Sequence, residues 1–147
     1  MRENIPATYL SGNMEWQEQQ QILNELGSNY CKFKMLYVTP EKIARSDNLL
    51  RHLESLHRRD LLTRIVIDEA HCISQWGHDF RLDYQGLGIF KQMFLKVPLL
   101  DLTTIATTSV KEDVVQALGF VNCVVFRKTF NRSNLRYSIM PKTKNMY

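Results

Sequence analysis

The sequence IVIDEAH, residues 65–71, decides how the rest of the chain is interpreted. Its three β-branched apolar residues predict a buried strand, and Asp68 and Glu69 follow where that strand ends. In open parallel sheets, ligand sites form at the carboxyl ends of strands. Two adjacent carboxylates favour a divalent cation such as Mg²⁺, which completes its shell with water and phosphate oxygens. The pattern therefore predicts a phosphoryl-transfer site, and an acidic pair that only starts the next helix is the alternative.

Apolar runs alternate with amphipathic segments on both sides of this strand. Strands are expected at residues 7–10, 33–39, 64–67, 99–103, 121–126 and 135–139. Helices are expected from Asn13 to Leu26 with a left-handed stop at Gly27, from Ser46 or Asp47 with Leu49, Leu53 and Leu56 on one face, from Tyr84 to Phe94, and from a Ser109–Glu112 capping box to Gly119.

This alternation predicts an α/β fold, in which a parallel sheet carries helices on both faces. The uninterrupted apolar runs at 65–67 and 123–126 agree with strands that are buried on two sides. The tail from Pro141 to Tyr147 is polar and basic, and we expect it to fray. Residues 1–140 are thus expected to belong to one domain, and residues 141–147 to a basic tail.

The bulk composition is that of an ordinary globular domain. The 147 residues are 44% hydrophobic and 23% charged, and the net charge of +4 weakly favours a polyanionic partner. Cys31, Cys72 and Cys123 form no CxxC pair, which disfavours a zinc ribbon and suits a reducing compartment. No apolar run approaches the ~18 residues of a membrane span, and the first residues lack the apolar core of a signal peptide. We expect no membrane partner, and a location in the cytosol or nucleus.

An aromatic-rich segment follows the acidic pair. Trp76, Phe80 and Tyr84 are spaced by four residues, which is also the spacing of an apolar helical stripe. Gly77 and Asp79 disfavour a helix there. The segment is interpreted as a loop that offers ring faces to unpaired bases, because base–aromatic stacking does not depend on nucleotide sequence.

Four segments together resemble RecQ-type DNA helicases. DEAH at 68–71 resembles motif II of superfamily-two helicases, and SQWGHDFRLDY at 74–84 resembles the aromatic-rich loop that marks RecQ proteins. MLYVTPEK at 35–42 looks like their motif Ib region, and FNRSNLRY at 130–137 looks like the segment that closes their first RecA-like lobe. The sequence of these segments is most similar to plant members of the Bloom-syndrome-helicase group. The resemblance implies a partial RecA-like (P-loop NTPase) lobe.

The resemblance also implies roles around the DEAH segment. Asp68 would hold Mg²⁺ through water, and Glu69 would orient and deprotonate the water that attacks the γ-phosphate of ATP. His71 would relay the state of the nucleotide towards the DNA side. The implied cofactors are ATP and Mg²⁺.

A further set of residues is implied to couple single-stranded DNA to ATP hydrolysis. The set consists of Gln75, Trp76, His78, Phe80 and Arg81 in the aromatic segment, with Thr103 and Thr107 in motif III. The chain departs from the family at Leu82, where the family has proline, and in motif III, where DLTTIATT at 101–108 has Ile105 in place of a threonine. Isoleucine cannot make the hydroxyl hydrogen bond of threonine, and Asp101 places a charge on a strand expected to be buried.

No phosphate-binding loop is found in these residues. The glycines stand at positions 12, 27, 77, 86, 88 and 119, and none precedes a lysine. The resemblance therefore implies a fragment, without the P-loop strand, of a 3′→5′ helicase that acts on single-stranded or forked DNA in nuclear recombination and repair. It would need the P-loop segment and a second RecA-like lobe for activity. Two alternatives remain open: a non-catalytic remnant that binds single-stranded DNA, and a metal-dependent nuclease built on Asp68, Glu69, Asp79 and Asp83.

Overall fold

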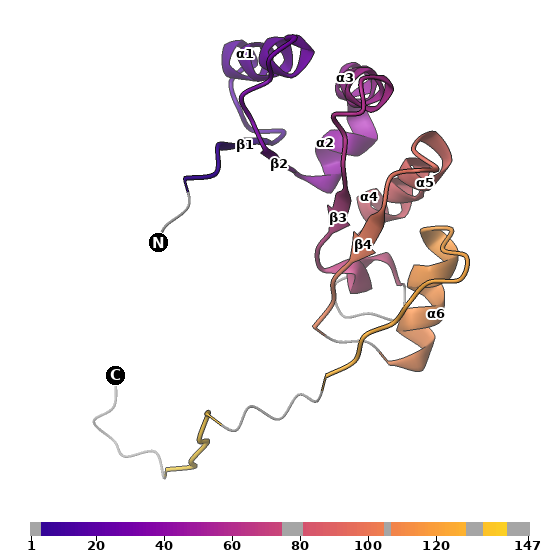
Figure 1. Ribbon diagram of the computed structural model, residues 1–147. Coiled ribbons are helices and arrows are strands. Elements are labelled where there is room, and N and C mark those ends of the chain that lie inside the picture. Colours follow the sequence, from indigo (N-terminus) through magenta and orange to yellow (C-terminus); the bar gives the residue numbers. More distant parts are fainter. Residues whose placement is uncertain (1–3, 75–80, 105–106, 129–133, 141–147) are drawn as a thin grey trace.

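The computed structural model describes residues 4–74, 81–104, 107–128 and 134–140. Strands and helices alternate along them, as predicted (Figure 1). The elements are β1 (Ala7–Leu10), α1 (Trp16–Gly27), β2 (Met35–Val38), α2 (Pro40–Arg45), α3 (Asp47–Arg58), β3 (Ile65–Ile67), the 3-10 turn η1 (Ala70–Ile73), α4 (Leu82–Gln85), the 3-10 turn η2 (Gly86–Gly88), α5 (Ile89–Met93), β4 (Leu99–Asp101) and α6 (Thr108–Ala117).

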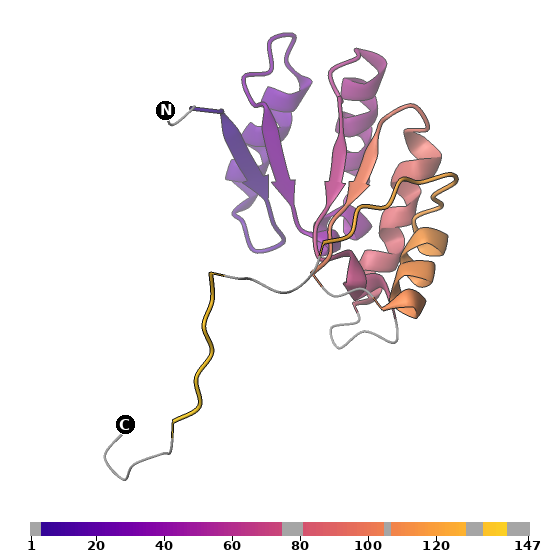
Figure 2. The ribbon, with the colours of Figure 1, turned by 60° about the horizontal axis from the view of Figure 1, so that its bottom comes forward.

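The four strands form two parallel pairs. Strand β1 pairs with β2 in a register that aligns Tyr9 with Tyr37, and β3 pairs with β4 in a register that aligns Ile67 with Asp101. All four run in the same direction and lie side by side in Figure 2, but β2 and β3 share no ladder. The predicted parallel α/β arrangement is confirmed, with two small sheets in place of one.

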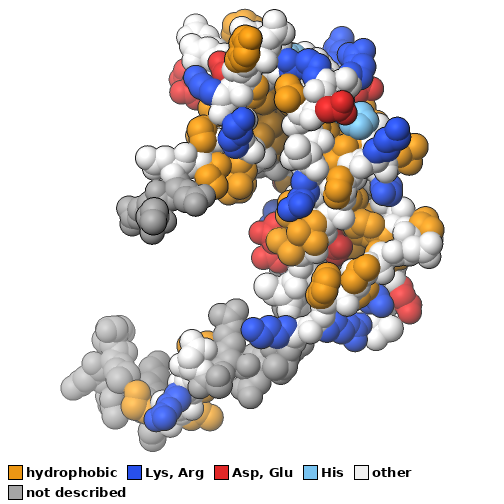
Figure 3. Space-filling view, viewed as in Figure 1, with side chains coloured by type: hydrophobic (Ala, Val, Ile, Leu, Met, Phe, Trp, Pro, Cys, Tyr) orange, Lys and Arg blue, Asp and Glu red, His pale blue; other side chains and the backbone are white. Residues whose placement is uncertain are grey.

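The helices of the described residues lie on one side of the strands, not on both as predicted (Figures 1 and 2). Side chains alternate across a strand, so Leu10 and Ile67 face the helices and are buried. On the opposite face, Tyr9 is 59% exposed and Tyr37 is 62% exposed. Figure 3 shows hydrophobic side chains on this side of the molecule. The apolar composition of the strands thus predicted burial that only one face receives.

The core lies between the strands and the helices. In α3, Leu49, Leu53 and Leu56 are all buried, which confirms the predicted apolar face. The hydroxyl of Ser46 accepts a hydrogen bond from the amide of Leu49 at 3.3 Å, so Ser46 is the predicted helix cap. Phe94, after α5, is 1% exposed, and the His57 ring meets it edge-on. Helix α3 is therefore fixed by both its cap and its apolar face.

Several predicted helix ends are wrong by a few residues. Helix α1 begins at Trp16 rather than beside Asn13, and Gly27 is its last helical residue rather than a left-handed stop. Pro40, which directly follows the strand expected at 33–39, occupies the first turn of α2, where its missing N–H costs nothing. Helix α6 is capped by Thr107, not by Ser109. Gly119 follows the end of α6, as predicted, and its backbone is left-handed with φ of 65°.

Two predicted strands are not formed. Residues 121–126 and 135–139 have no ladder partner among the described residues. Phe126 and Tyr137 are each 90% exposed. A β-prone run becomes a strand only where a neighbouring edge offers hydrogen bonds, and composition alone does not provide that edge.

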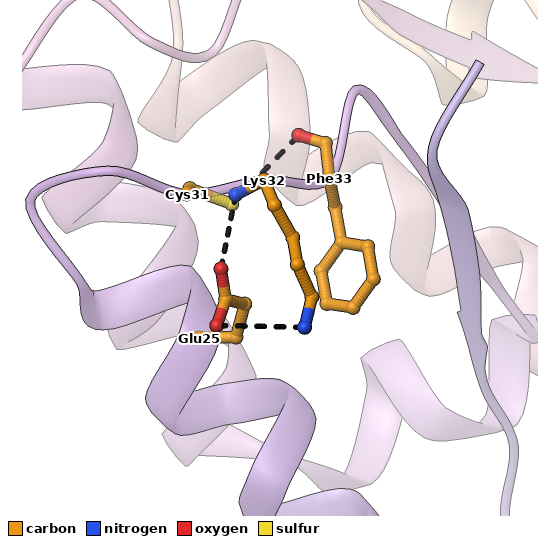
Figure 4. A network of polar contacts seen from close by, with 4 residues as sticks. All are labelled: Glu25, Cys31, Lys32 and Phe33. Carbon is orange, nitrogen blue, oxygen red and sulfur yellow. Dashed lines mark hydrogen bonds and ion pairs between the residues drawn. The ribbon is translucent and has the colours of Figure 1, made fainter. Parts of the chain in front are cut away.

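The connection from α1 to β2 is held by a small polar network (Figure 4). A carboxylate oxygen of Glu25 accepts from the backbone amide of Lys32 at 3.0 Å, and the Lys32 ammonium lies 5.2 Å from the centre of the Phe33 ring. Contacts at the surface fix this turn and the start of β2.

None of the helices in the described ranges is long and apolar enough to cross a membrane.

Candidate active site at the carboxyl end of strand β3

Strand β3 delivers Asp68 and Glu69 to the surface, where the sequence predicted a site. Both residues are exposed, and the Asp68 carboxylate accepts a hydrogen bond from the Glu69 amide at 2.9 Å. Glu69 adopts left-handed backbone angles, φ 54° and ψ 40°. Asp60 and Asn122 are also left-handed, but short polar residues tolerate that conformation and glutamate does not. Strain of this kind gathers at functional sites, and it turns the chain sharply into η1.

His71 joins this turn to the segment after β4. Its Nδ1 lies 3.1 Å from the Thr103 hydroxyl and 3.3 Å from a carboxylate oxygen of Glu69. The side chain of His71 is only 12% exposed, against 50% for Glu69. The structure thus brings three predicted site residues together: Glu69, His71 and Thr103.

Backbone hydrogen bonds set the position of the turn. The Leu102 amide donates to the Ile67 carbonyl at 2.8 Å, and the Ala70 amide donates to the Leu102 carbonyl at 2.9 Å. These bonds continue the β3–β4 pairing past the end of the strands. Asp101, paired with Ile67, is only half-buried, so its charge keeps contact with water.

The donor set suits Mg²⁺ held by few protein ligands. Asp68 and Glu69 present exposed carboxylates, and within the described residues no group of at least three His, Cys, Asp or Glu side chains could hold a metal ion. One or two carboxylates with water and phosphate oxygens are the ordinary environment of Mg²⁺. The nuclease alternative needs a larger carboxylate cluster, which the described residues do not supply; Asp79 lies outside them.

The aromatic segment is described only at its two ends. Gln75, Trp76, His78 and Phe80 lie outside the described residues. Before them, Ser74 is buried and its hydroxyl donates to the Asp113 carboxylate of α6 at 2.5 Å. After them, the Arg81 amide donates to the Cys72 carbonyl at 2.9 Å, and the Arg81 side chain is exposed. The two ends of the segment are thus held to η1 and α6.

The sequence suggested that the ring of Tyr84 could face solvent, but it does not. It lies in α4, and its side chain is buried in the core. Burial raises the pKa of the Tyr84 phenol above its ordinary 10.0, as do the nearby Cys72 and acidic side chains, while Arg81 acts in the opposite direction. At position 84, the aromatic side chain is therefore a core residue.

Thr107 has a structural task in addition to its predicted role. Its hydroxyl caps α6 by accepting from the amide of Val110 at 3.4 Å, and it lies 3.0 Å from the Ser109 hydroxyl. The sequence reasoning missed the Ser74–Asp113 contact and the left-handed Glu69. No local sequence signal reports either, because one joins residues far apart in the chain and the other departs from residue preference.

Comparison with known proteins places the chain in a family. No protein-family model matches the chain. It is 67% identical over 143 residues to "ATP-dependent DNA helicase Q-like 4B" of Arabidopsis thaliana, covering 97% of this chain and 12% of that protein. It is 46% identical over 139 residues to "RecQ-like DNA helicase BLM" of Xenopus laevis, covering 95% of this chain and 10% of that protein. It is 45% identical over 144 residues to "ATP-dependent DNA helicase hus2/rqh1" of Schizosaccharomyces pombe, covering 98% of this chain and 11% of that protein.

The chain belongs to the RecQ family of DNA helicases, as a RecQ-like segment. It spans only 10–12% of the length of these relatives. The predicted resemblance is therefore confirmed.

Proposed function

We propose that these residues are the later part of the first RecA-like lobe of an ATP-driven 3′→5′ DNA helicase, acting in recombination and repair in the nucleus. Residues 1–140 belong to this lobe, and residues 141–147 lead out of it. One observation carries the proposal: the carboxyl end of β3 presents Asp68 and Glu69 beside His71 and Thr103. That arrangement suits phosphoryl transfer coupled to a second segment.

Asp68 and Glu69 have separate tasks in this proposal. Asp68 follows β3 directly and is exposed, so it can hold Mg²⁺ through water, and the ion would offset charge on the phosphates of ATP. Glu69 is half-exposed, and its carboxylate lies 3.3 Å from the His71 ring. Glu69 orients the attacking water and accepts its proton, as a general base does.

His71 and Thr103 carry the state of this site to the DNA side. The His71 ring contacts both Glu69 and Thr103, so a change in the charge around Glu69 alters the His71–Thr103 hydrogen bond. Thr103 belongs to the segment that ends in Thr107 and α6. This chain of contacts suits a relay between ATP and DNA.

The aromatic segment binds single-stranded or forked DNA in the proposed function. Trp76 and Phe80 stack on unpaired bases, while Gln75, His78 and Arg81 supply polar or cationic contacts. Support comes from the exposed Arg81 and from the position of the segment between η1 and α4. With Trp76→Ala and Phe80→Ala together, affinity for single-stranded DNA should fall at least about tenfold, since each stack contributes roughly 1–3 kcal/mol. Unchanged binding in a fluorescence-anisotropy titration would contradict this role.

The phosphate-binding loop and the second lobe belong to the longer helicase in this proposal. Without a lysine on the phosphates, positioning and charge stabilisation both suffer. We expect no measurable DNA-stimulated ATPase from the isolated 147-residue chain. Turnover by that chain, lost in Glu69→Gln, would overturn this expectation.

The test of the whole proposal uses the full-length helicase that carries these residues, or the chain grafted in place of the matching segment of the Arabidopsis relative. Glu69→Gln should lower DNA-stimulated ATP hydrolysis at least about 100-fold, the usual effect of losing a general base. Glu54→Gln, an exposed change on α3, is the matched control and should leave the rate unchanged. Equal rates in the two variants would reject the proposed role of Glu69.

A further inference from the structure

Ser74 is buried directly before the aromatic segment, and it is the one buried polar residue of the described part of the chain. The residue is 1% exposed, and its hydroxyl donates to Oδ2 of Asp113 at 2.5 Å. A hydroxyl removed from water needs such a partner, and a carboxylate makes the stronger kind of hydrogen bond. The contact spans 39 positions of sequence, from the end of η1 to the middle of α6.

Two other contacts among the described residues join the same turn, residues 69–74, to the stretch that leads into α6. The Ala70 amide reaches the Leu102 carbonyl at 2.9 Å, and the His71 ring reaches the Thr103 hydroxyl at 3.1 Å. The Ser74–Asp113 bond closes the far end of the same turn. Residues 69–74 are thus held to the segment that starts at Leu102 at both ends and in the middle.

We propose that Asp113 is a positioning residue for DNA-coupled hydrolysis. It holds Ser74, and with it the turn that carries His71, against the helix that continues the Thr103–Thr107 segment. Asp113 touches neither ATP nor DNA. Its effect passes through Ser74 to the geometry between the ATP side and the DNA side, so this inference rests on the proposed function.

The burial of the acidic side chains of α6 agrees with a specific role for Asp113. Asp113 is partly buried against the η1 turn, whereas its neighbour Glu112 is exposed. Val110 and Val114 are buried and pack α6 in place. The buried valines therefore hold the helix in the core, and the Asp113 carboxylate adds a specific hydrogen bond to Ser74.

The test compares Asp113→Ala, Asp113→Asn and Ser74→Ala in the full-length helicase or the graft, with Glu112→Ala as the matched control. The readout is the ratio of DNA-stimulated to basal ATPase, measured well below the unfolding temperature. We expect this ratio to fall about tenfold in Asp113→Ala and Ser74→Ala, as for the loss of one charge-assisted hydrogen bond, with the KM for ATP unchanged. Asp113→Asn keeps an acceptor oxygen and should restore most of the ratio.

Three results would overturn the inference: a wild-type ratio in Asp113→Ala, equal losses of basal and stimulated rates, or additive losses in the Ser74→Ala, Asp113→Ala double variant. Two groups that act only through each other should give a double variant no worse than either single one. Glu69→Gln in the same protein tests the proposed function separately. If Glu69→Gln abolishes turnover while Asp113→Ala keeps DNA stimulation, only the role of Asp113 fails.

Discussion

The β1–β2 half of the chain and the β3–β4 half use the same parallel pairing, but their strands end differently. After β2, the Thr39 carbonyl accepts from the amides of Lys42 and Ile43 at 3.0 and 3.2 Å, and Pro40 begins an ordinary helix. After β3, Glu69 turns left-handed into a short 3-10 turn, and exposed carboxylates result. Parallel pairing does not require the second arrangement, since the first half manages without it. The irregular exit of β3 is therefore the feature that calls for a functional explanation.

The halves also differ in what holds them together. In the first half, long helices pack side by side, and the Arg59 guanidinium joins the end of α3 to the end of α1. In the second half, the short elements α4, η2 and α5 follow one another. Here Gly88 of η2 packs closely against the backbone of Ala117 in α6. Stability in the second half thus depends on a few tight positions.

Gly88 should give the largest effect on stability. A Cβ at Gly88 would lie 2.4 Å from the Ala117 carbonyl oxygen, which is backbone and cannot move aside alone. We expect Gly88→Ala to lower the free energy of unfolding by about 3 kcal/mol, as overpacking does. Gly86→Ala is the matched control, because nothing lies within 4 Å of a Cβ there. Urea unfolding followed by circular dichroism measures both, and equal midpoints would contradict the close packing of α6.

Arg59 should give the next effect, this time in the first half. Its guanidinium donates to the carbonyls of Ser28 at 2.7 Å and Leu26 at 2.8 Å. Arg59→Ala leaves both carbonyls without this donor, so we expect a loss of about 2 kcal/mol in the same unfolding experiment. The neighbouring Arg58 is exposed, so Arg58→Ala should change the free energy of unfolding little. In the full-length helicase or the graft, ATPase activity per folded molecule should stay unchanged in both variants, which separates stability in this half from chemistry in the other.

The sequence predicted the regular half better than the irregular one, for physical reasons. Leu49, Leu53 and Leu56 repeat at helical spacing behind the Ser46 cap, and local rules suffice for such a helix. The runs at 121–126 and 135–139 failed because strand formation depends on a distant partner edge. The exposed strand face was missed because apolar composition does not tell which neighbours are present.

For the candidate site, the sequence predicted the position but not the geometry. The motif located Asp68, Glu69 and His71, and Thr103 came from the same resemblance. The contact of His71 with both Glu69 and Thr103 depends on the β3–β4 register, which no local pattern encodes. Thr107 was predicted for DNA coupling, yet its capping of α6 was assigned to Ser109.

The smallest expected effect on stability compares the two strand exits directly. Glu69→Gly removes the Cβ from a left-handed residue and should raise the free energy of unfolding by about 1 kcal/mol, while removing the proposed general base. Glu41→Gly, in the helix that follows β2, should lower it by about 1 kcal/mol, because glycine is a poor helix former. Opposite signs in urea unfolding, together with loss of ATP turnover when Glu69→Gly is made in the full-length helicase or the graft, would mean that the exit of β3 keeps a strained residue for its chemistry. A loss of stability in Glu69→Gly would contradict that interpretation, because a backbone that was not strained has nothing to gain from glycine.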